Sequence, residues 1–116
     1  MEVFSFSDLV EPGEPIKVLA RVVVLASEAG GKSQPFTKNY RPNHNFGAPE
    51  NTQFYIGQVE VPEGMWIHPG ETHDLEVTFL RGPGLSELLQ IGSVWRIQEG
   101  KQLVATAEVL RLQGEA

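Results

Sequence analysis

The chain has 116 residues, close to the usual size of one domain, and 41% of them are hydrophobic, which is enough for one compact core. It contains no cysteine, so disulfides, zinc–thiolate sites and a thiol nucleophile are excluded. Nine basic and fifteen acidic residues give a net charge of −6, which opposes non-specific binding to nucleic acid or anionic lipid. The N-terminus is acidic and no apolar run approaches the roughly 20 residues of a membrane span, so we expect a cytoplasmic protein.

The first half of the chain predicts two strands. Residues 1–18 alternate weakly at Phe4 and Phe6 and are expected to form an N-terminal arm or an edge strand. Residues 18–26 are a run rich in β-branched side chains, too short for an ordinary helix, and they predict a strand buried on both faces or nearly so. Residues 53–61 predict a second strand, with Gly57 as a candidate bulge.

The second half predicts three more strands. Residues 74–80 place Leu75, Val77 and Phe79 on one face and polar side chains on the other, which is the period of a half-buried strand. Residues 94–98 and 102–112 flank a short Gly-containing connection and predict a β-hairpin. Residues 85–91 have room for one helical turn, with Ser86 as its cap. Twelve glycines and eight prolines separate these elements, which is typical of an all-β sandwich or barrel.

Residues 26–33 fit a relaxed phosphate-loop pattern that ends in Gly31-Lys32-Ser33 and follows a strand. A phosphate loop needs a helix whose N-terminal amides face the phosphates, but the next residues include Pro35 and show no helical period. No later Asp is placed at the end of a parallel strand to hold magnesium. We therefore expect no nucleotide binding and no cofactor.

A second cluster, residues 68–74, contains the imidazoles of His68 and His73 and two carboxylates, which are common metal ligands. Pro69-Gly70 marks a tight turn, and nothing in the sequence fixes both rings on one centre as a helical i, i+4 pair would. We expect a surface turn with no metal. Because no Ser/His/Asp arrangement or catalytic carboxylate pair stands out, we assign no catalytic residue and predict that the chain is not an enzyme.

Residues 30–46 form a long loop that contains no acidic residue but carries both cations and aromatic rings. These residues are Lys32, Phe36, Lys38, Tyr40, Arg41 and Phe46. Long ordered loops are often functional, and aromatic rings between cations can bind nucleic acid through stacking and phosphate contacts. Alternatively, the aromatic rings hold the loop against the end of the barrel while the lysines stay in solvent. Both interpretations can hold together.

The same loop strongly resembles the third, C-terminal domain of the bacterial elongation factor Tu family, whose pattern here is EEGG(R/K)xxPFxxxYRPxxxF. The matching residues are Glu28-Ala29-Gly30-Gly31-Lys32, Pro35-Phe36, Tyr40-Arg41-Pro42 and Phe46. Later segments resemble the family's LPEG, MPGD and FAIREGG motifs, at residues 61–64, 69–71 and 95–100. The resemblance implies a six-stranded antiparallel β-barrel over residues 19–113, with a short tail at 114–116, as a stand-alone domain without the GTPase domain.

In this family the barrel contacts the T-stem backbone of aminoacyl-tRNA and packs against the nucleotide domain. The resemblance therefore implies an RNA- or partner-binding site, with Phe36 and Tyr40 as aromatic anchors. Its residues are Lys32, Ser33, Lys38, Arg41, Asn43, Glu99 and Gly100. Some positions depart from the family: Ser33 replaces a common His, Asn43 replaces a Gln, and about four residues are inserted within 48–55.

Together these features predict a non-enzymatic, translation-related binding module whose partner is tRNA or another RNA, or a protein. A protein-docking or mimic role outside translation is the alternative. A metal-dependent enzyme at the His68/His73 turn is a remote alternative. The sequence gives no membrane partner and leaves the oligomeric state open.

Overall fold

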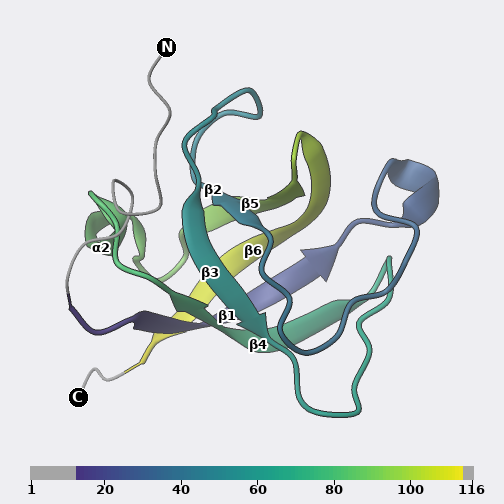
Figure 1. Cartoon of the computed structure of the whole chain (residues 1–116), viewed down its shortest axis with the longest axis horizontal. Coiled ribbons are helices and arrows are strands. Elements are labelled where there is room, and N and C mark those ends of the chain that lie inside the picture. Colours follow the sequence, from purple (N-terminus) through teal and green to yellow (C-terminus); the bar gives the residue numbers. More distant parts are fainter. Residues whose placement is uncertain (1–12, 114–116) are drawn as a thin grey trace.

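A computed structural model describes residues 13–113, and in this part of the chain six strands close into an antiparallel β-barrel (Figure 1). The order around the barrel is β1-β4-β3-β2-β5-β6. The strands are β1 (Ile16–Val24), β2 (Asn43–Asn45), β3 (Tyr55–Glu60), β4 (Thr72–Phe79), β5 (Val94–Glu99) and β6 (Gln102–Leu112). The predicted fold class, an all-β six-stranded antiparallel barrel, is confirmed.

Alternation of inward and outward side chains along the strands builds the core. In β4, Leu75, Val77 and Phe79 are buried and the residues between them are not, as their period predicts. β1 alternates in the same way, so the expectation that it is buried on both faces is wrong. Its outward positions include Arg21 and Val23, and Val23 is 46% exposed because a barrel wall buries one face only.

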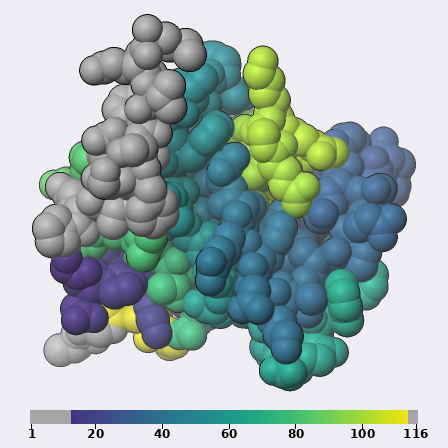
Figure 2. All heavy atoms as spheres, in the orientation of Figure 1, coloured from purple at the N-terminus to yellow at the C-terminus, as the bar shows by residue number. Residues whose placement is uncertain are grey.

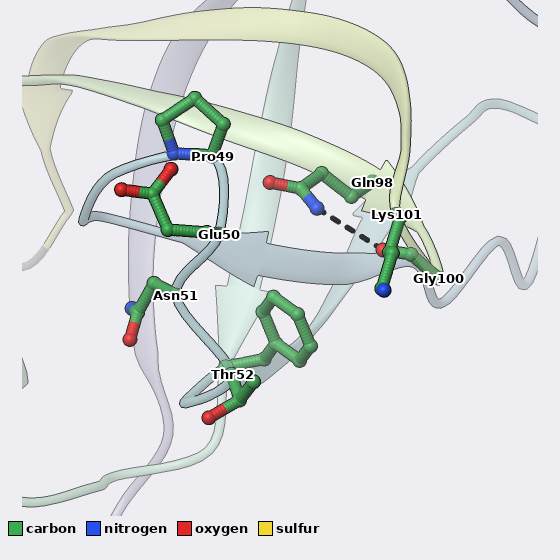
Figure 3. A pocket seen from close by; sticks show the side chains of 8 residues that line it. Pro49, Glu50, Asn51, Thr52, Gln98, Gly100 and Lys101 are labelled. Atoms are coloured by element: carbon green, nitrogen blue, oxygen red, sulfur yellow. Dashed lines mark hydrogen bonds between the residues drawn. The ribbon is translucent and has the colours of Figure 1, made fainter.

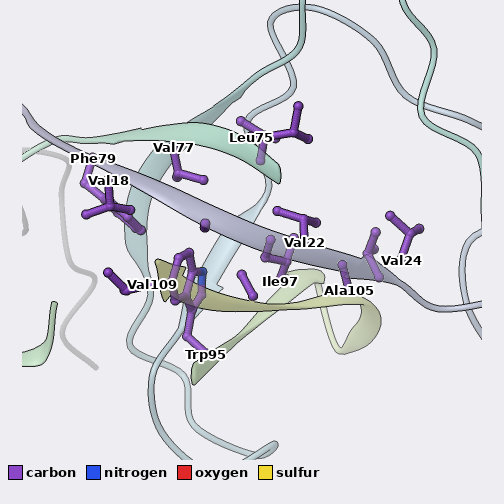
Figure 4. Close-up of a cluster of buried hydrophobic side chains, with 14 of the residues drawn as sticks. Val18, Val22, Val24, Leu75, Val77, Phe79, Trp95, Ile97, Ala105 and Val109 are labelled. Carbon is purple, nitrogen blue, oxygen red and sulfur yellow. The ribbon is translucent and has the colours of Figure 1, made fainter. Parts of the chain in front are cut away.

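The largest buried side chains gather inside the barrel, as Figure 4 shows for Phe79, Trp95 and Ile97. Phe79 lies edge-on to Trp95, with the ring centroids 5.6 Å apart. Burial of one such side chain stabilises the fold by roughly 1.5–3 kcal/mol. With no disulfide available, this packing is the main source of stability.

A buried imidazole shares this core. His44 accepts a hydrogen bond from the Trp95 indole at 3.0 Å, and its Nε2 lies 3.0 Å from the Gly57 carbonyl oxygen. Gly57 continues the regular pairing with Phe79, so it is not a bulge. A Cβ at this position would lie 3.0 Å from the Phe79 ring and 3.1 Å from the His44 ring, which explains why glycine is needed there.

Two short helical elements lie between strands. The 3-10 turn η1 (Ser27–Ala29) follows β1, and α2 (Leu85–Leu88) lies between β4 and β5 within the predicted range 85–91. Ser86 is not the cap: Gly84 occupies that position with φ 76°, a left-handed conformation that suits glycine. The Ser86 hydroxyl instead contacts the carboxylate of Glu87.

The two ends of the chain belong only partly to the barrel. Residues 1–12 of the predicted N-terminal arm and the tail 114–116 lie outside the described residues. Residues 16–18 of the same predicted segment begin β1 and pair with β4. Among the described residues, no helix has the length and apolar composition needed to cross a membrane.

Candidate binding surface

Three segments that are distant in the sequence meet at one end of the barrel. The β5–β6 turn projects between the loop at 46–54 and the loop that carries η1 (Figure 1), and Figure 2 shows it raised beside the residues of the 30–46 loop. Gln102 fastens this arrangement, because its amide donates to the carbonyl oxygen of Gly31 at 3.0 Å. We call residues 30–54 together with the β5–β6 turn the binding edge.

The carboxylate of Glu99 links the 30–46 loop to the turn. Glu99 Oε2 accepts a hydrogen bond from the Tyr40 hydroxyl at 2.5 Å and lies 3.2 Å from Lys32 Nζ. Burial, and next the hydrogen bond to Glu99, raise the pKa of Tyr40 above its usual value of 10.0, so its hydroxyl stays protonated and acts as a donor. Lys32, Tyr40 and Glu99 therefore form one cluster.

The loop's aromatic rings face the protein. Phe36 is 5% exposed and stacks on Tyr40 with the ring centroids 4.2 Å apart. Backbone bridges from Phe36 to Ile67 and from Tyr40 to Val59 hold the loop against the barrel. This is the arrangement expected if the aromatic rings hold the loop in place, and it leaves Phe36 inaccessible to a partner.

The cations of the loop differ in how they are compensated. Lys38 Nζ lies 2.9 Å from a carboxylate oxygen of Glu63, in the turn between β3 and β4. Arg41 donates from Nε to the neutral amide oxygen of Gln58 at 2.8 Å, and no described carboxylate pairs with it. Together with the Lys32–Glu99 pair, this leaves Arg41 as the least compensated cation of the three.

The remaining site residues predicted from the sequence, Ser33, Asn43 and Gly100, belong to three different segments. Ser33 is exposed in the loop, and Gly100 is exposed in the β5–β6 turn with φ 60°. Asn43 belongs to β2, where it pairs with Ile56 and Gln98. Arg41 and Asn43 line one wall of a hollow of about 350 Å³, and residues 52–56 line the rest of it.

A larger hollow of about 500 Å³ opens between residues 49–54 and the β5–β6 turn (Figure 3). Phe54, Gln98, Gly100 and Lys101 contribute to its walls. Of these, only Gly100 belongs to the site predicted from the sequence. Phe54 and Lys101 show no local motif, and the main available signal was the inserted length within 48–55, since long loops often carry function.

Gln98 lines this hollow, and the buried Asn45 holds Gln98 in place. Both are buried, and the Asn45 amide donates to Gln98 Oε1 at 2.8 Å. Gln98 donates in turn to the Gly100 carbonyl oxygen at 3.0 Å. Each buried amide is satisfied, so the two side chains fix the shape of the loop and the turn above them.

In the histidine turn at residues 68–74, Glu71 contacts both His68 and His73. Its carboxylate accepts a hydrogen bond from the His68 backbone at 2.9 Å and lies 3.1 Å from His73 Nε2, and these contacts lower the pKa of Glu71. Among residues 13–113, no group of three or more His, Asp or Glu side chains is placed to hold a metal ion. The segment that resembles a phosphate loop runs from η1 into the 30–46 loop, and no helix follows it there.

No protein-family model matches this chain. The binding edge itself combines a loop held against the barrel by backbone bridges, a hairpin turn, paired charges and a hollow with mainly apolar walls.

Proposed function

We propose that the chain is a non-enzymatic binding module whose partner is a protein and whose contact surface is the binding edge. The main support for this proposal is that carboxylates neutralise two cations of the binding edge. Lys32 and Lys38 are each paired with a carboxylate from another part of the chain, so two of the edge's four cations are compensated and only Arg41 and Lys101 have no ion pair among the described residues. Binding to RNA relies on uncompensated cations facing phosphates, whereas a protein interface typically has an apolar centre within a polar rim.

The resemblance to the elongation factor Tu barrel supports a binding role of either kind, because that barrel meets both tRNA and a protein domain. It leaves the choice of partner to the electrostatics of this chain. A net charge of −6 and the carboxylates that pair with Lys32 and Lys38 favour the protein. RNA is the alternative outcome of the experiment below.

The test begins with capture of partners from an extract of the source cells, with and without ribonuclease. We expect a protein that is retained after ribonuclease treatment. Its affinity is then measured at 50 and 200 mM salt. An RNA partner held by three cations would lose about 40-fold in affinity over this range, because each neutralised phosphate contributes about 0.9 to the logarithmic salt slope. A protein partner should change only a few-fold.

Substitution of the three loop cations by alanine separates the two partners. The changes are Lys32→Ala, Lys38→Ala and Arg41→Ala, which take the net charge from −6 to −9. For a protein partner we expect a slower association rate with a smaller change in dissociation rate, since charges at the rim act mainly on encounter. The matched control makes the same charge change on the barrel wall, with Lys17→Ala, Arg21→Ala and Arg111→Ala. Complete loss of binding in the loop variant alone, with a steep salt slope, would instead identify RNA.

A further inference from the structure

The hollow beneath residues 49–54 has the properties of a ligand pocket. Its volume of about 500 Å³ lies within the range of small-ligand sites, roughly 300–1,000 Å³, and such sites combine apolar walls with a few polar groups. Pro49, Thr52 and Phe54 contribute apolar surface, and the side chain of Gln98 lies at its base. Figure 3 shows Pro49, Thr52 and Gln98 around one opening between the loop and the hairpin turn.

Hydrogen bonds prepare the pocket before any ligand arrives. Asn45 Oδ1 accepts from the Gly47 amide at 2.8 Å and from the Asn51 side chain at 3.0 Å. Asn45 Nδ2 donates to the Ala48 carbonyl oxygen and to Gln98, at 2.9 and 2.8 Å. One buried side chain thus fixes both walls, and a preformed pocket avoids the entropic cost of ordering a loop on binding.

The charges at the rim are asymmetric. Lys101 is exposed and makes no ion pair with any described residue, unlike Lys32 and Lys38. Glu50 lies on the opposite side of the opening (Figure 3). A ligand with an anionic group would therefore be attracted at the Lys101 side and repelled at the Glu50 side, which orients it in the pocket.

We infer that this pocket receives an aromatic side chain of the partner protein, from a segment that also places a carboxylate beside Lys101. The inference rests on the proposed function and names the chemistry of the partner. The volume exceeds what one aliphatic side chain fills, and the Phe54 ring offers a surface on which another ring can pack. Aromatic anchors that fill a central pocket are typical of the residues that dominate protein interfaces.

N-acetyl-L-tryptophan serves as a probe, because it combines an aromatic ring with a carboxylate. NMR titration of the full chain should give saturable shifts of the Gln98 side-chain amide and of the Gly100 and Lys101 backbone amides. The neutral analogue N-acetyl-L-tryptophanamide should bind roughly two- to fivefold more weakly, as expected for a single exposed charge pair. Shifts that do not saturate, or that spread over the whole surface, would overturn the inference.

Two variants make the test specific. Lys101→Gln should reduce probe affinity by roughly two- to fivefold and abolish the preference for the carboxylate, whereas Lys17→Gln, the same change at an exposed lysine on the barrel wall, should not. Phe54→Leu keeps an apolar side chain but removes the ring, and should weaken the probe about three- to tenfold. Equal affinities in all variants would show that the probe binds elsewhere.

The captured partner connects the probe to the function. If the partner is a protein, Lys101→Gln and Phe54→Leu should weaken it as well, and an unchanged affinity would overturn the inference while the proposed function stands. Capture of RNA alone would overturn the proposed function. It would also overturn the inference that the aromatic ring comes from a partner protein, even when the probe binds. Absence of probe binding overturns the inference whichever partner is captured.

Discussion

The buried His44 should make the stability of the barrel fall steeply in mild acid. The Trp95 indole is only a donor, so His44 Nδ1 must accept, and the ring proton sits on Nε2 facing the Gly57 carbonyl oxygen at 3.0 Å. Burial lowers the pKa of His44 from 6.5 to about 4, although the bond to Gly57 acts in the opposite direction. Protonation would place a second N–H against the indole N–H in a site shielded from water.

The sign and size of the effect follow from this difference in pKa. The unfolded chain takes up a proton on His44 below pH 6.5, whereas the folded chain resists it until about pH 4. The stability is therefore fully present above pH 6.5 and is lost as the pH falls through this window. At about 1.4 kcal/mol per pKa unit the loss reaches about 3 kcal/mol at pH 4, a large share of the roughly 5–15 kcal/mol of a small domain.

Urea unfolding followed by tryptophan fluorescence between pH 4 and 8 measures this loss. In His44→Gln, which cannot titrate, the slope of stability against pH should be shallower than in the parent chain. Exposed carboxylates such as Glu71 contribute equally to both chains and cancel in the comparison. His68→Gln is the control, because the His68 side chain is 57% exposed. An identical pH slope in His44→Gln and the parent chain, or an NMR titration of the His44 ring near pH 6.5, would refute the reasoning.

The remaining predictions concern packing and the binding edge. Phe79→Ala should lower the free energy of unfolding by about 3–5 kcal/mol, because it empties a buried site. Thr78→Ala should lower it by only about 1 kcal/mol, because it removes one part-buried hydrogen bond. Equal losses in urea unfolding would show that the faces of β4 are reversed. Asn45→Ala should cost roughly 1–3 kcal/mol and speed amide exchange in residues 47–53, and unchanged exchange there would contradict its role as an anchor. Glu99→Gln removes the ion pair with Lys32 and should lower the free energy of unfolding by less than about 1 kcal/mol. A loss of several kcal/mol would mean that the cluster is also needed to stabilise the fold.

Strands in which polar and apolar residues alternate could be predicted from the sequence, because each barrel strand has one solvent-exposed face and one buried face. The residues of β4 alternate, and their burial follows. β1 misled the prediction because β-branched residues favour strands on either face, so the outward Val23 looks like a core residue in the sequence. Propensity identified the strand but not which of its faces is buried.

β2 could not be predicted because its residues carry no strand signal. It consists of Asn43, His44 and Asn45, which are poor strand formers by composition. The segment is extended because β3 and β5 pair with its two sides and close the barrel between them. Tertiary pairing overrides local preference here, and the same pairing buries His44 and Asn45 where their polar atoms find partners.

The electrostatics of the binding edge were beyond sequence reasoning for a related reason. The loop at 30–46 shows a local charge of +3 from its lysines and arginine, which favours an RNA partner. Folding brings Glu63 to Lys38 from 25 residues away and Glu99 to Lys32 from the far end of the chain. These two carboxylates reduce +3 to +1. A charge run therefore predicts a field only when the folded neighbours of each cation are known, and here those neighbours leave Arg41 as the one cation of the loop without an ion pair among the described residues.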